Sequence, residues 1–435
     1  MSAKTIRLID IAWALVEYLL SVPQAVKEAE RSAGGVQFRY ISCNESASGA
    51  GMKPLSVAFG IFRIEPRGGA ENLCLQIAAS LEARGHAVTI VTTAAPSTVP
   101  GRILRIEGAT RPRTNHGRVR VFAAAFADAT RSGYDRTVAF QPMPAQIVVL
   151  VHRMFDRPDK PLWKRATPRF RTLAGLEAAC MARGSEARLI GLTRGQVAEF
   201  AERYDVAPER IAIMPPPVAP AMRRAEPVGG VERKALLRDF GISGSGPLWL
   251  WIGLQPETKG LDRVIQALAC VPEAELLVCG VPKDAPKARP ALRLARRLSV
   301  EKRIAWLGYV PPGDDRLAGA LRVADVLAHP ARSEAAGMVI LEAIFNGLPV
   351  VATALCGYGG HILESGCGAV IQEPFDLDRF VDALRIVAAQ HDRMTGKGIA
   401  YGTDPSLYSG VASAADLIEA PLDRPWPPTL RLRGG

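Results

Sequence analysis

The chain has 435 residues, of which 48% are hydrophobic and 22% charged. This length and composition predict a folded protein with two or three domains and exclude a disordered or fibrous chain. The formal net charge of +11 indicates an acidic partner, such as a phosphorylated substrate, an anionic lipid surface or nucleic acid, without choosing among them.

The cysteines and the apolar runs narrow the class of protein further. The seven cysteines are an odd number and include no Cys-x-x-Cys pair, so they predict neither a disulfide framework nor a zinc cluster and fit a reducing compartment. No apolar run reaches the roughly 18 residues that a membrane-spanning helix needs. The nearest approach, residues 9–22, contains Asp10 and Glu17 and is expected to form an amphipathic helix.

Residues 1–51 differ in character from the rest of the chain. They are polar and glycine-rich beyond Gln24 and end in SASGAG, and a fresh strand pattern follows Met52. We interpret residues 1–51 as an N-terminal extension of unassigned role, and our hypothesis is that Met52 is the true start of the protein.

From residue 55 onward, the hydrophobic period alternates between strand and helix, as a doubly wound parallel sheet requires. Strand patterns occur at 55–61, 88–93, 137–141, 189–193 and 210–214, and a helix pattern at 194–204. Gly68 and Gly69 stand at the turn after the first strand, where backbone can approach a ligand and helix amides can receive phosphate; a simple tight turn is the alternative. We predict a first Rossmann-like domain over residues 52–218.

A second alternating half follows a boundary region. Residues 219–247 are rich in proline, glycine and charge and are predicted to link two domains. Residues 248–395 are predicted to form a second Rossmann-like domain, and residues 396–435 a C-terminal helix that packs back on the first domain, followed by a tail. The predicted fold class is therefore α/β, with two Rossmann-like domains facing across a cleft that receives the ligand at the carboxyl ends of their strands.

The stretch SEAAGMVILEAIFNGLPVVAT, residues 333–353, carries two glutamates eight positions apart around Gly337. Glu334 is expected in the loop that enters a helix, where unpaired amides can hold an anion or a sugar hydroxyl. Glu342 is expected on the second turn, where two carboxylate oxygens suit the vicinal diol of a ribose. The alternative is an amphipathic helix with a charge at each end.

The stretch GLQPETKG, residues 253–260, follows a strand pattern and opens a helix pattern. Lys259 therefore stands where a point charge could neutralise a diphosphate. A lysine that merely occupies the first turn of a helix is the alternative interpretation.

These motifs occur together in an order and spacing that resemble the retaining nucleotide-sugar glycosyltransferases of fold type B, in the manner of glycosyltransferase family 4. The motifs are GGAE (68–71), GLQPETKG and EAAGMVILEAIFNGLPVV. Within this family, ATALCGYGGHI, CGAVIQEPF, TNHGR (114–118) and FQPMP (140–144) look like the lipopolysaccharide core glucosyltransferases that add the first glucose to inner-core heptose.

The resemblance implies the substrates and the reaction. It implies UDP-glucose as donor, a lipid-linked heptose as acceptor, retention of the anomeric configuration, no cofactor and no metal, and a cytoplasmic protein held at the surface of the inner membrane. Asp376 and Asp378 formally match an acidic metal-binding pair, but we interpret Asp376 as a helix cap. Another cell-surface glycan, or a nucleotide-sugar-binding protein that has lost turnover, remain the alternatives.

The resemblance also implies a role for each motif residue. Glu334, with the amides of Gly337 and Met338, would hold the donor sugar, Glu342 the ribose, and Lys259 the diphosphate.

On the first domain, Gly68 and Gly69 would close over the phosphates. The usual aspartate of the following helix is replaced by Leu73, so Glu71 becomes the candidate that activates the acceptor.

The chain departs from its relatives beside Lys259. Relatives place an arginine near this lysine, whereas this chain has Leu254 and Thr258. Arg67 or Arg63 is expected to compensate, because positive charge near the leaving diphosphate controls the rate.

Two further regions concern the acceptor. Asn115, His116 and Arg118 are expected in a polar loop that meets the acceptor. The alternative is that His116 is a loop histidine bonded to backbone. Residues 153–171 hold seven basic side chains interleaved with aromatic residues, which is typical of an anionic membrane surface. A solvated face is the alternative, and nucleic acid is disfavoured because no binding motif accompanies the cluster.

Overall fold

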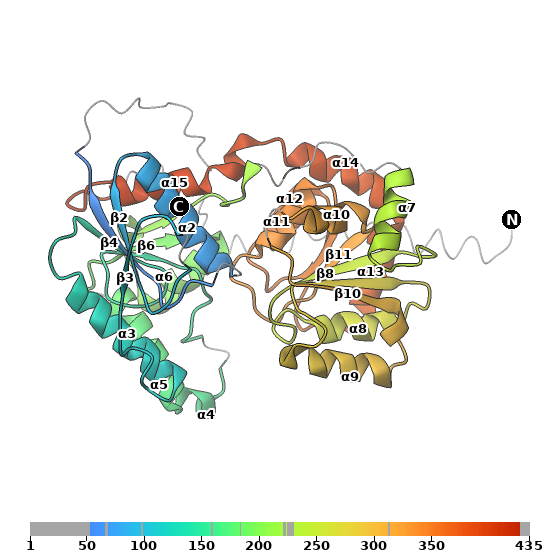
Figure 1. Ribbon diagram of the computed structural model, residues 1–435, viewed down its shortest axis with the longest axis horizontal. Coiled ribbons are helices and arrows are strands. Elements are labelled where there is room, and N and C mark those ends of the chain that lie inside the picture. The colour runs from blue at the N-terminus through green and yellow to red at the C-terminus, as the bar shows by residue number, and fades with distance from the viewer. Residues whose placement is uncertain are drawn as a thin grey trace, which may run out of the picture.

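The computed structural model describes residues 53–426, apart from 66–67, 97–98, 158–159, 183, 221–222, 224–229 and 312–313. The predictions for residues 1–51, Met52 and Arg67 lie outside this part of the chain. The described residues form two α/β units that lie side by side, and the last helices run along both (Figure 1).

The first unit is built on a seven-stranded sheet with the order β3-β2-β1-β4-β5-β6-β7. All its strand pairs are parallel. The strands are β1 (Ser56–Gly60), β2 (Ala87–Thr92), β3 (Arg102–Arg105), β4 (Arg136–Ala139), β5 (Ile147–Val149), β6 (Arg188–Gly191) and β7 (Ile211–Ile213). The helices are α2 (Gly69–Ala83), α3 (Asn115–Ala129), α4 (Leu162–Arg165), α5 (Pro168–Met181) and α6 (Arg194–Tyr204).

The second unit is built on a six-stranded parallel sheet with the order β10-β9-β8-β11-β12-β13. The strands are β8 (Leu248–Ile252), β9 (Glu275–Cys279), β10 (Ile304–Gly308), β11 (Val326–His329), β12 (Val350–Thr353) and β13 (Gly368–Ile371). The helices are α7 (Gly230–Asp239), α8 (Leu261–Ala269), α9 (Arg289–Arg297), α10 (Asp315–Val323), α11 (Met338–Phe345), α12 (Gly359–Ser365) and α13 (Leu377–Ala389). Helix α7 packs against α10, so it lies with this sheet.

The strands are short apolar runs because helices cover both faces of each parallel sheet. Phe59 and Val138 in the first unit and Leu250 and Leu327 in the second are fully buried at paired positions of neighbouring strands. The predicted α/β fold with two doubly wound parallel sheets is therefore confirmed.

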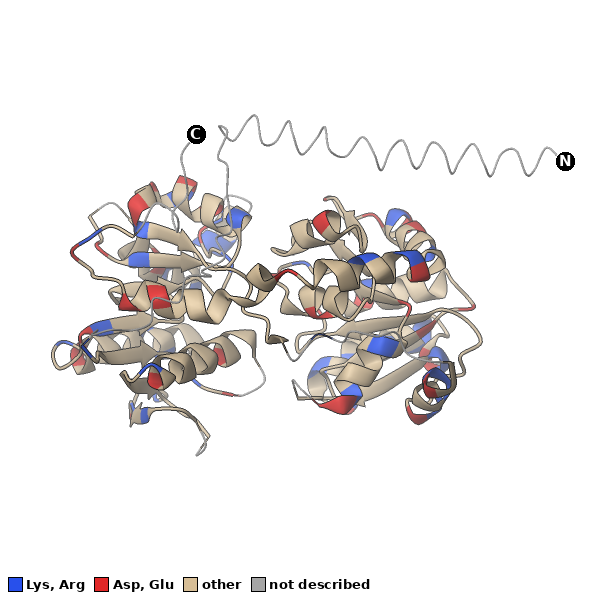
Figure 2. Cartoon of the chain, turned by 90° about the horizontal axis from the view of Figure 1, so that it is seen from above, with Lys and Arg blue, Asp and Glu red and all other residues tan. Residues whose placement is uncertain are grey.

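The end of the described chain connects the two units. Helix α14 (His391–Tyr401) packs against α11, and α15 (Gly410–Glu419) packs against α2 of the first unit. Arg84 at the end of α2 donates to Asp416 over 2.7 Å and to Glu419 over 2.9 Å. In the view from above, charged residues of both signs are spread over the helices of both units (Figure 2). No helix among the described residues is long and apolar enough to cross a bilayer.

Candidate active site

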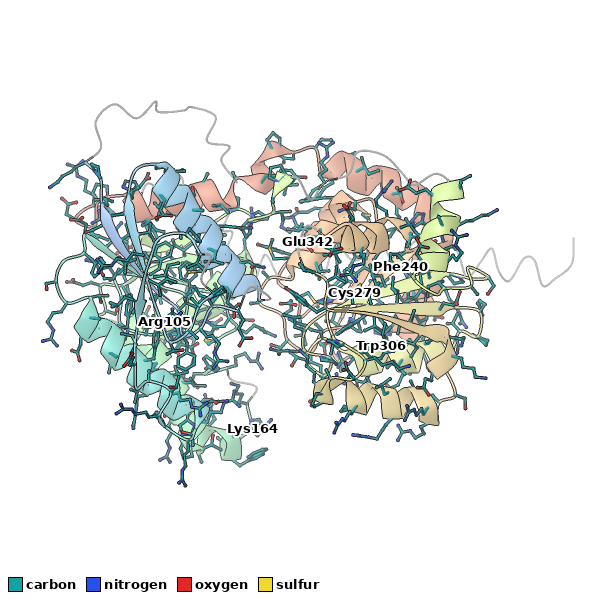
Figure 3. All side chains as sticks on the ribbon, in the orientation of Figure 1. Arg105, Lys164, Phe240, Cys279, Trp306 and Glu342 are labelled. Atoms are coloured by element: carbon teal, nitrogen blue, oxygen red, sulfur yellow. The ribbon has the colours of Figure 1, made fainter. Side chains whose placement is uncertain are left out.

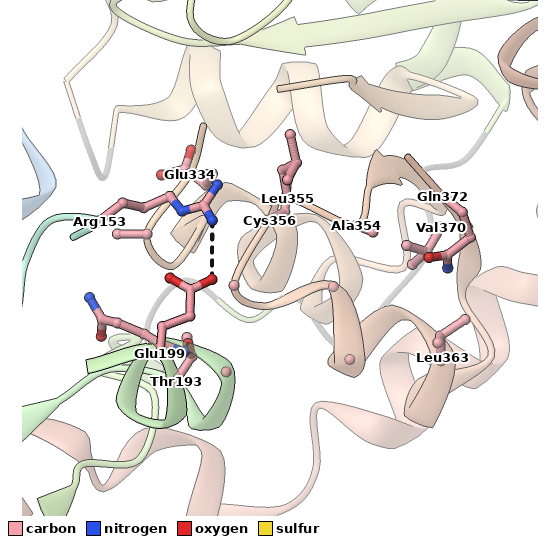
Figure 4. A pocket seen from close by; sticks show the side chains of 16 residues that line it. Arg153, Thr193, Glu199, Glu334, Ala354, Leu355, Cys356, Leu363, Val370 and Gln372 are labelled. Atoms are coloured by element: carbon pink, nitrogen blue, oxygen red, sulfur yellow. Dashed lines mark hydrogen bonds and ion pairs between the residues drawn. The ribbon is translucent and has the colours of Figure 1, made fainter. Parts of the chain in front are cut away.

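A cavity of about 290 Å³ lies between the two units. The first unit contributes Arg153, Thr193 and Glu199 to its wall, and the second contributes Glu334 and the loop after β12 (Figure 4). These residues follow the carboxyl ends of their strands, where doubly wound sheets bind ligands.

Glu334 occupies the loop between β11 and α11, and two cationic groups hold its carboxylate. Lys259 Nζ donates to Glu334 Oε2, and His329 Nε2 lies 3.4 Å from the same oxygen. Burial alone would raise the pKa of Glu334, but the His329 contact and the Lys259 charge lower it to about 2. Glu334 is therefore an ionised carboxylate fixed in the cavity wall.

His329 ends β11, and its side chain is only 1% exposed. Burial disfavours the imidazolium, but the contacts with Cys356 and Glu334 outweigh burial and raise the pKa of His329 to about 9. Its Nδ1 atom has no hydrogen-bond partner among the described residues. His329 was not among the predicted site residues; its place at the end of a strand pattern, just before the Glu334 loop, was the available signal.

Gly337 turns the chain into helix α11. Its φ of 95° lies in the left-handed region, and a Cβ there would come within 3.0 Å of Ile340 Cδ1 and 3.2 Å of Glu334 Cγ. Only glycine fits such a position without strain. The amides of the first turn of α11, including that of Met338, follow directly after Glu334 and are the groups that a helix start offers to an anion or a hydroxyl.

Glu342 lies on the second turn of α11, on the part of the second unit that faces the first (Figure 3). Its side chain is half-buried, and burial raises the pKa of its carboxyl to about 7. A bound diol would donate hydrogen bonds to this carboxylate and favour its ionised form.

Two hydrogen bonds to the backbone of Lys259 fix this residue just before α8. Trp251 Nε1 donates to the Lys259 carbonyl over 3.0 Å, and the Lys259 amide donates to the Gln255 carbonyl over 2.9 Å. Arg332 donates to the Glu257 carbonyl of this loop over 2.7 Å and to both carboxylate oxygens of Asp262 over 2.7 and 2.6 Å. Lys259 is therefore fixed beside Glu334, while Arg332 already has an acidic partner.

The glycine pair of the first unit begins a helix. Gly68 is the N-cap and Gly69 the first residue of α2, and Glu71 folds back over Gly68. Burial raises the pKa of the Glu71 carboxyl. Leu73 is 5% exposed in the hydrophobic core, so the position of the usual aspartate faces the interior. Arg63 pairs with Glu65 over 2.9 Å on the surface.

The prediction of a polar loop at residues 114–118 is wrong, because these residues begin a helix. Asn115 is the first residue of α3, and Thr114 caps it by accepting a hydrogen bond from the Gly117 amide over 3.2 Å. His116 lies 3.4 Å from Thr114 Oγ1, and Arg118 donates to Pro112 over 2.7 Å. The N-cap preference of threonine outweighed the polar composition.

Asp376 caps α13, as predicted, by accepting a hydrogen bond from the Arg379 amide over 2.8 Å. Across the described ranges, no three His, Cys, Asp or Glu side chains gather in a way that could hold a metal ion.

Two family models match the two units separately. The model for Glycosyltransferase Family 4 matches residues 67–221, and the model for group 1 glycosyl transferases matches residues 232–395. Together with the paired Rossmann-like sheets, these matches define a glycosyltransferase.

Comparison with individual proteins identifies the family. The chain is 34% identical to the lipopolysaccharide glucosyltransferase WaaG of Escherichia coli K12 over 380 residues, which cover 84% of this chain and 99% of that protein. The chain belongs to the family of that glucosyltransferase. It is also 25% identical to the D-inositol 3-phosphate glycosyltransferase of Nocardia farcinica over 241 residues, which cover 54% of this chain and 52% of that protein.

Solved structures share the fold of this chain. The crystal structure of WaaG superposes with a TM-score of 0.75 at 31% identity and covers 83% of this chain and 99% of its own. The structure of Anabaena HepE in complex with UDP-glucose superposes with a TM-score of 0.62 at 16% identity, over 84% of this chain and 98% of its own, and shows the shared fold.

Proposed function

We propose that this glycosyltransferase transfers glucose from UDP-glucose to a heptose of the lipopolysaccharide inner core, with retention, at the cytoplasmic face of the membrane. The observation that carries the proposal is the ionised Glu334, held by Lys259 beside the first turn of α11 in the interdomain cavity. The likeness to WaaG over most of both chains supports the choice of glucose and of the core acceptor.

In this proposal, the donor lies along α11. Glu342 accepts hydrogen bonds from the ribose, the amides of Gly337 and Met338 meet the sugar beside Glu334, and Lys259 contacts the diphosphate. Half-burial of Glu342 supports its role, because a buried carboxylate without a charged partner gains most from ligand hydroxyls.

The chemistry assigned to these residues is electrostatic. As the glycosidic bond to the diphosphate breaks, negative charge grows on the leaving group and the sugar becomes positive. Lys259 stabilises the first charge and the Glu334 carboxylate the second. Gly68 and Gly69 would approach the phosphates from the first unit, and Glu71 would lie nearest the acceptor.

The membrane contact is proposed for the α4–α5 tip, which we define as Leu162, Trp163, Lys164, Arg169 and Arg171. Leu162 is 81% and Trp163 68% exposed, and Lys164 Nζ lies 5.3 Å from the Trp163 ring centre. Arg169 and Arg171 are also exposed, and Figure 3 shows Lys164 at the lower end of the first unit. Exposed apolar and cationic side chains together suit an anionic lipid surface.

The basic stretch 153–171 is not one surface. Arg153 lines the interdomain cavity, and Arg165 donates to Asp156 over 2.7 Å. These two arginines are therefore left out of the proposed membrane contact, and Leu162, which the sequence analysis did not single out, joins it.

Leu254, Thr258 and Leu73 favour a second candidate, a protein that binds the nucleotide sugar without turnover. Incubation of the purified protein with UDP-glucose and a heptose-terminated core acceptor tests both. The proposal predicts release of UDP and an acceptor heavier by one hexose. Binding of UDP with no turnover on any nucleotide sugar would favour the second candidate.

A further inference from the structure

A nucleotide-sugar donor carries a doubly charged diphosphate, and the described cations of the second unit around Lys259 already have partners. Lys287, for example, donates to the Leu254 carbonyl of the Lys259 loop over 2.6 Å. Lys259 is already paired with Glu334. Arg332 is bound to Asp262, and Arg263 packs over the Phe375 ring at 4.0 Å and donates to the Pro330 carbonyl. Leu254 and Thr258 occupy the positions near Lys259 where the sequence led us to expect an arginine.

The first unit places an arginine in the same cavity. Arg153 follows β5 and lines the cavity opposite Glu334, and Figure 4 shows its side chain reaching between Glu199 and Glu334. Its side chain is 18% exposed, and Nη2 donates to Glu199 Oε1 over 3.2 Å. A guanidinium has five N–H donors, so this single bond leaves the capacity to bind an anion in addition.

The loop that carries Arg153 is fixed by buried polar side chains. Gln196 Nε2 donates to the Leu150 carbonyl over 2.7 Å and to the His152 carbonyl over 2.8 Å. On the other side of Arg153, the fully buried Glu177 carboxylate accepts hydrogen bonds from the Phe155 amide over 2.9 Å and the Asp156 amide over 3.1 Å. A loop held on both sides of one arginine is a preorganised support for a ligand contact.

We propose that Arg153 is the second cation of the donor site, supplied by the opposite domain, and that it binds the diphosphate of the nucleotide sugar. The inference rests on the proposed function in two respects: the donor carries a diphosphate, and it lies beside Glu334 and Lys259. The diphosphate is the favoured anion because Arg153 and Glu334 line the same cavity, and Lys259, to which we assign the diphosphate, is paired with Glu334. Arg153 thus fills the role for which Arg63 and Arg67 were the expected residues.

The test measures binding of UDP, ADP, GDP and inorganic pyrophosphate to the full chain and to the Arg153→Ala variant by calorimetry. We expect at least a tenfold rise in the Kd for pyrophosphate and for the preferred nucleotide. Thr258→Arg, added to Arg153→Ala, should restore several-fold of the loss, whereas Thr258→Arg alone should change little. Arg131→Ala is the matched control, since Arg131 also forms an ion pair in the first unit but is 80% exposed on the surface.

Unchanged Kd values for pyrophosphate and nucleotide in Arg153→Ala would overturn the inference. If steady-state kinetics of Arg153→Ala showed a rise confined to the KM of the acceptor, that result would also overturn the inference and place Arg153 against the acceptor. Preference of the wild-type protein for ADP or GDP would contradict the proposed UDP donor, while the effect of Arg153→Ala on pyrophosphate would still decide the role of Arg153. Melting temperatures of all variants show whether a loss comes from unfolding.

Discussion

The donor side of the cavity and the α4–α5 tip use charge in opposite ways. Around Glu334, charged groups are largely buried, paired and directed at one point, with Lys259 and His329 on a single carboxylate oxygen. At the tip, Lys164 and its neighbours are exposed and surround the exposed Leu162 and Trp163. The first arrangement is suited to one small ligand, and the second to an extended surface.

This difference predicts how each region responds to mutation. Removing one charge of a buried ion pair leaves its partner buried without compensation, so single substitutions around Glu334 have large effects. Exposed charges are screened by water and salt, so each contributes little alone.

The largest effect is expected for Glu334→Gln. The variant loses the carboxylate that we assign to the positive sugar, and kcat should fall by about 10²–10³-fold. Steady-state UDP release measures it. A variant with wild-type kcat would separate Glu334 from the chemistry and would favour a purely structural role for its ion pair with Lys259.

Lys259→Ala is expected to lower kcat by about 10²-fold, because the leaving diphosphate loses a contact that strengthens as its charge grows. Lys302→Ala is the control, since Lys302 is exposed on the same unit. A higher KM with unchanged kcat would mean that Lys259 binds donor and transition state equally.

Glu342→Gln should separate binding from stability. In the wild-type protein, the pKa of Glu342 is about 7 in the folded state, above the reference value of 4.5. Protonated Glu342 therefore stabilises the fold fully below about pH 4.5, and this stabilisation is lost as pH rises through 7. The glutamine side chain stays neutral at every pH. The free energy of unfolding of the variant should therefore exceed that of the wild type by up to about 3 kcal/mol at pH 8, and by less at pH 5. Denaturant unfolding at both values of pH measures this.

The same variant should bind UDP-glucose about tenfold more weakly, since an amide has one acceptor oxygen where the carboxylate has two. Wild-type affinity should rise with pH through about 7 and the variant's should not, because hydroxyl donors favour the ionised Glu342. An equal pH dependence in both proteins would remove Glu342 from the ribose site.

The smallest effect is expected at the tip. Lys164→Gln should lower partitioning to anionic vesicles about fivefold, because one basic side chain near such a surface contributes on the order of 1 kcal/mol. Lys302→Gln should change nothing. Equal sedimentation of the wild-type protein with anionic and neutral vesicles would refute the membrane role of the tip.

The elements that surround the donor side could be predicted from the sequence because their signals are local. The boundaries of α6 match the predicted 194–204, and β1 and β7 lie within the strand patterns predicted at 55–61 and 210–214. Buried parallel strands give short apolar runs between turn residues, and such runs are easy to find.

The elements that were missed have weaker signals. Strands β3 and β5 have four and three residues, too short for a period to be seen. Helix α5 carries polar residues at many positions because much of it is exposed, and α3 begins in a polar stretch. Pairing of Lys259 with Glu334, the position of His329 behind them and the entry of Arg153 from the other unit depend on tertiary packing, which no local pattern encodes.

Transfer of radiolabelled glucose to heptose-terminated inner core, followed by NMR of the product, tests the central claim most directly. The account predicts transfer from UDP-glucose by the wild-type protein, loss of transfer in Glu334→Gln, and a new linkage with the same anomeric configuration as the donor. No transfer, or a linkage with the inverted configuration, would contradict it.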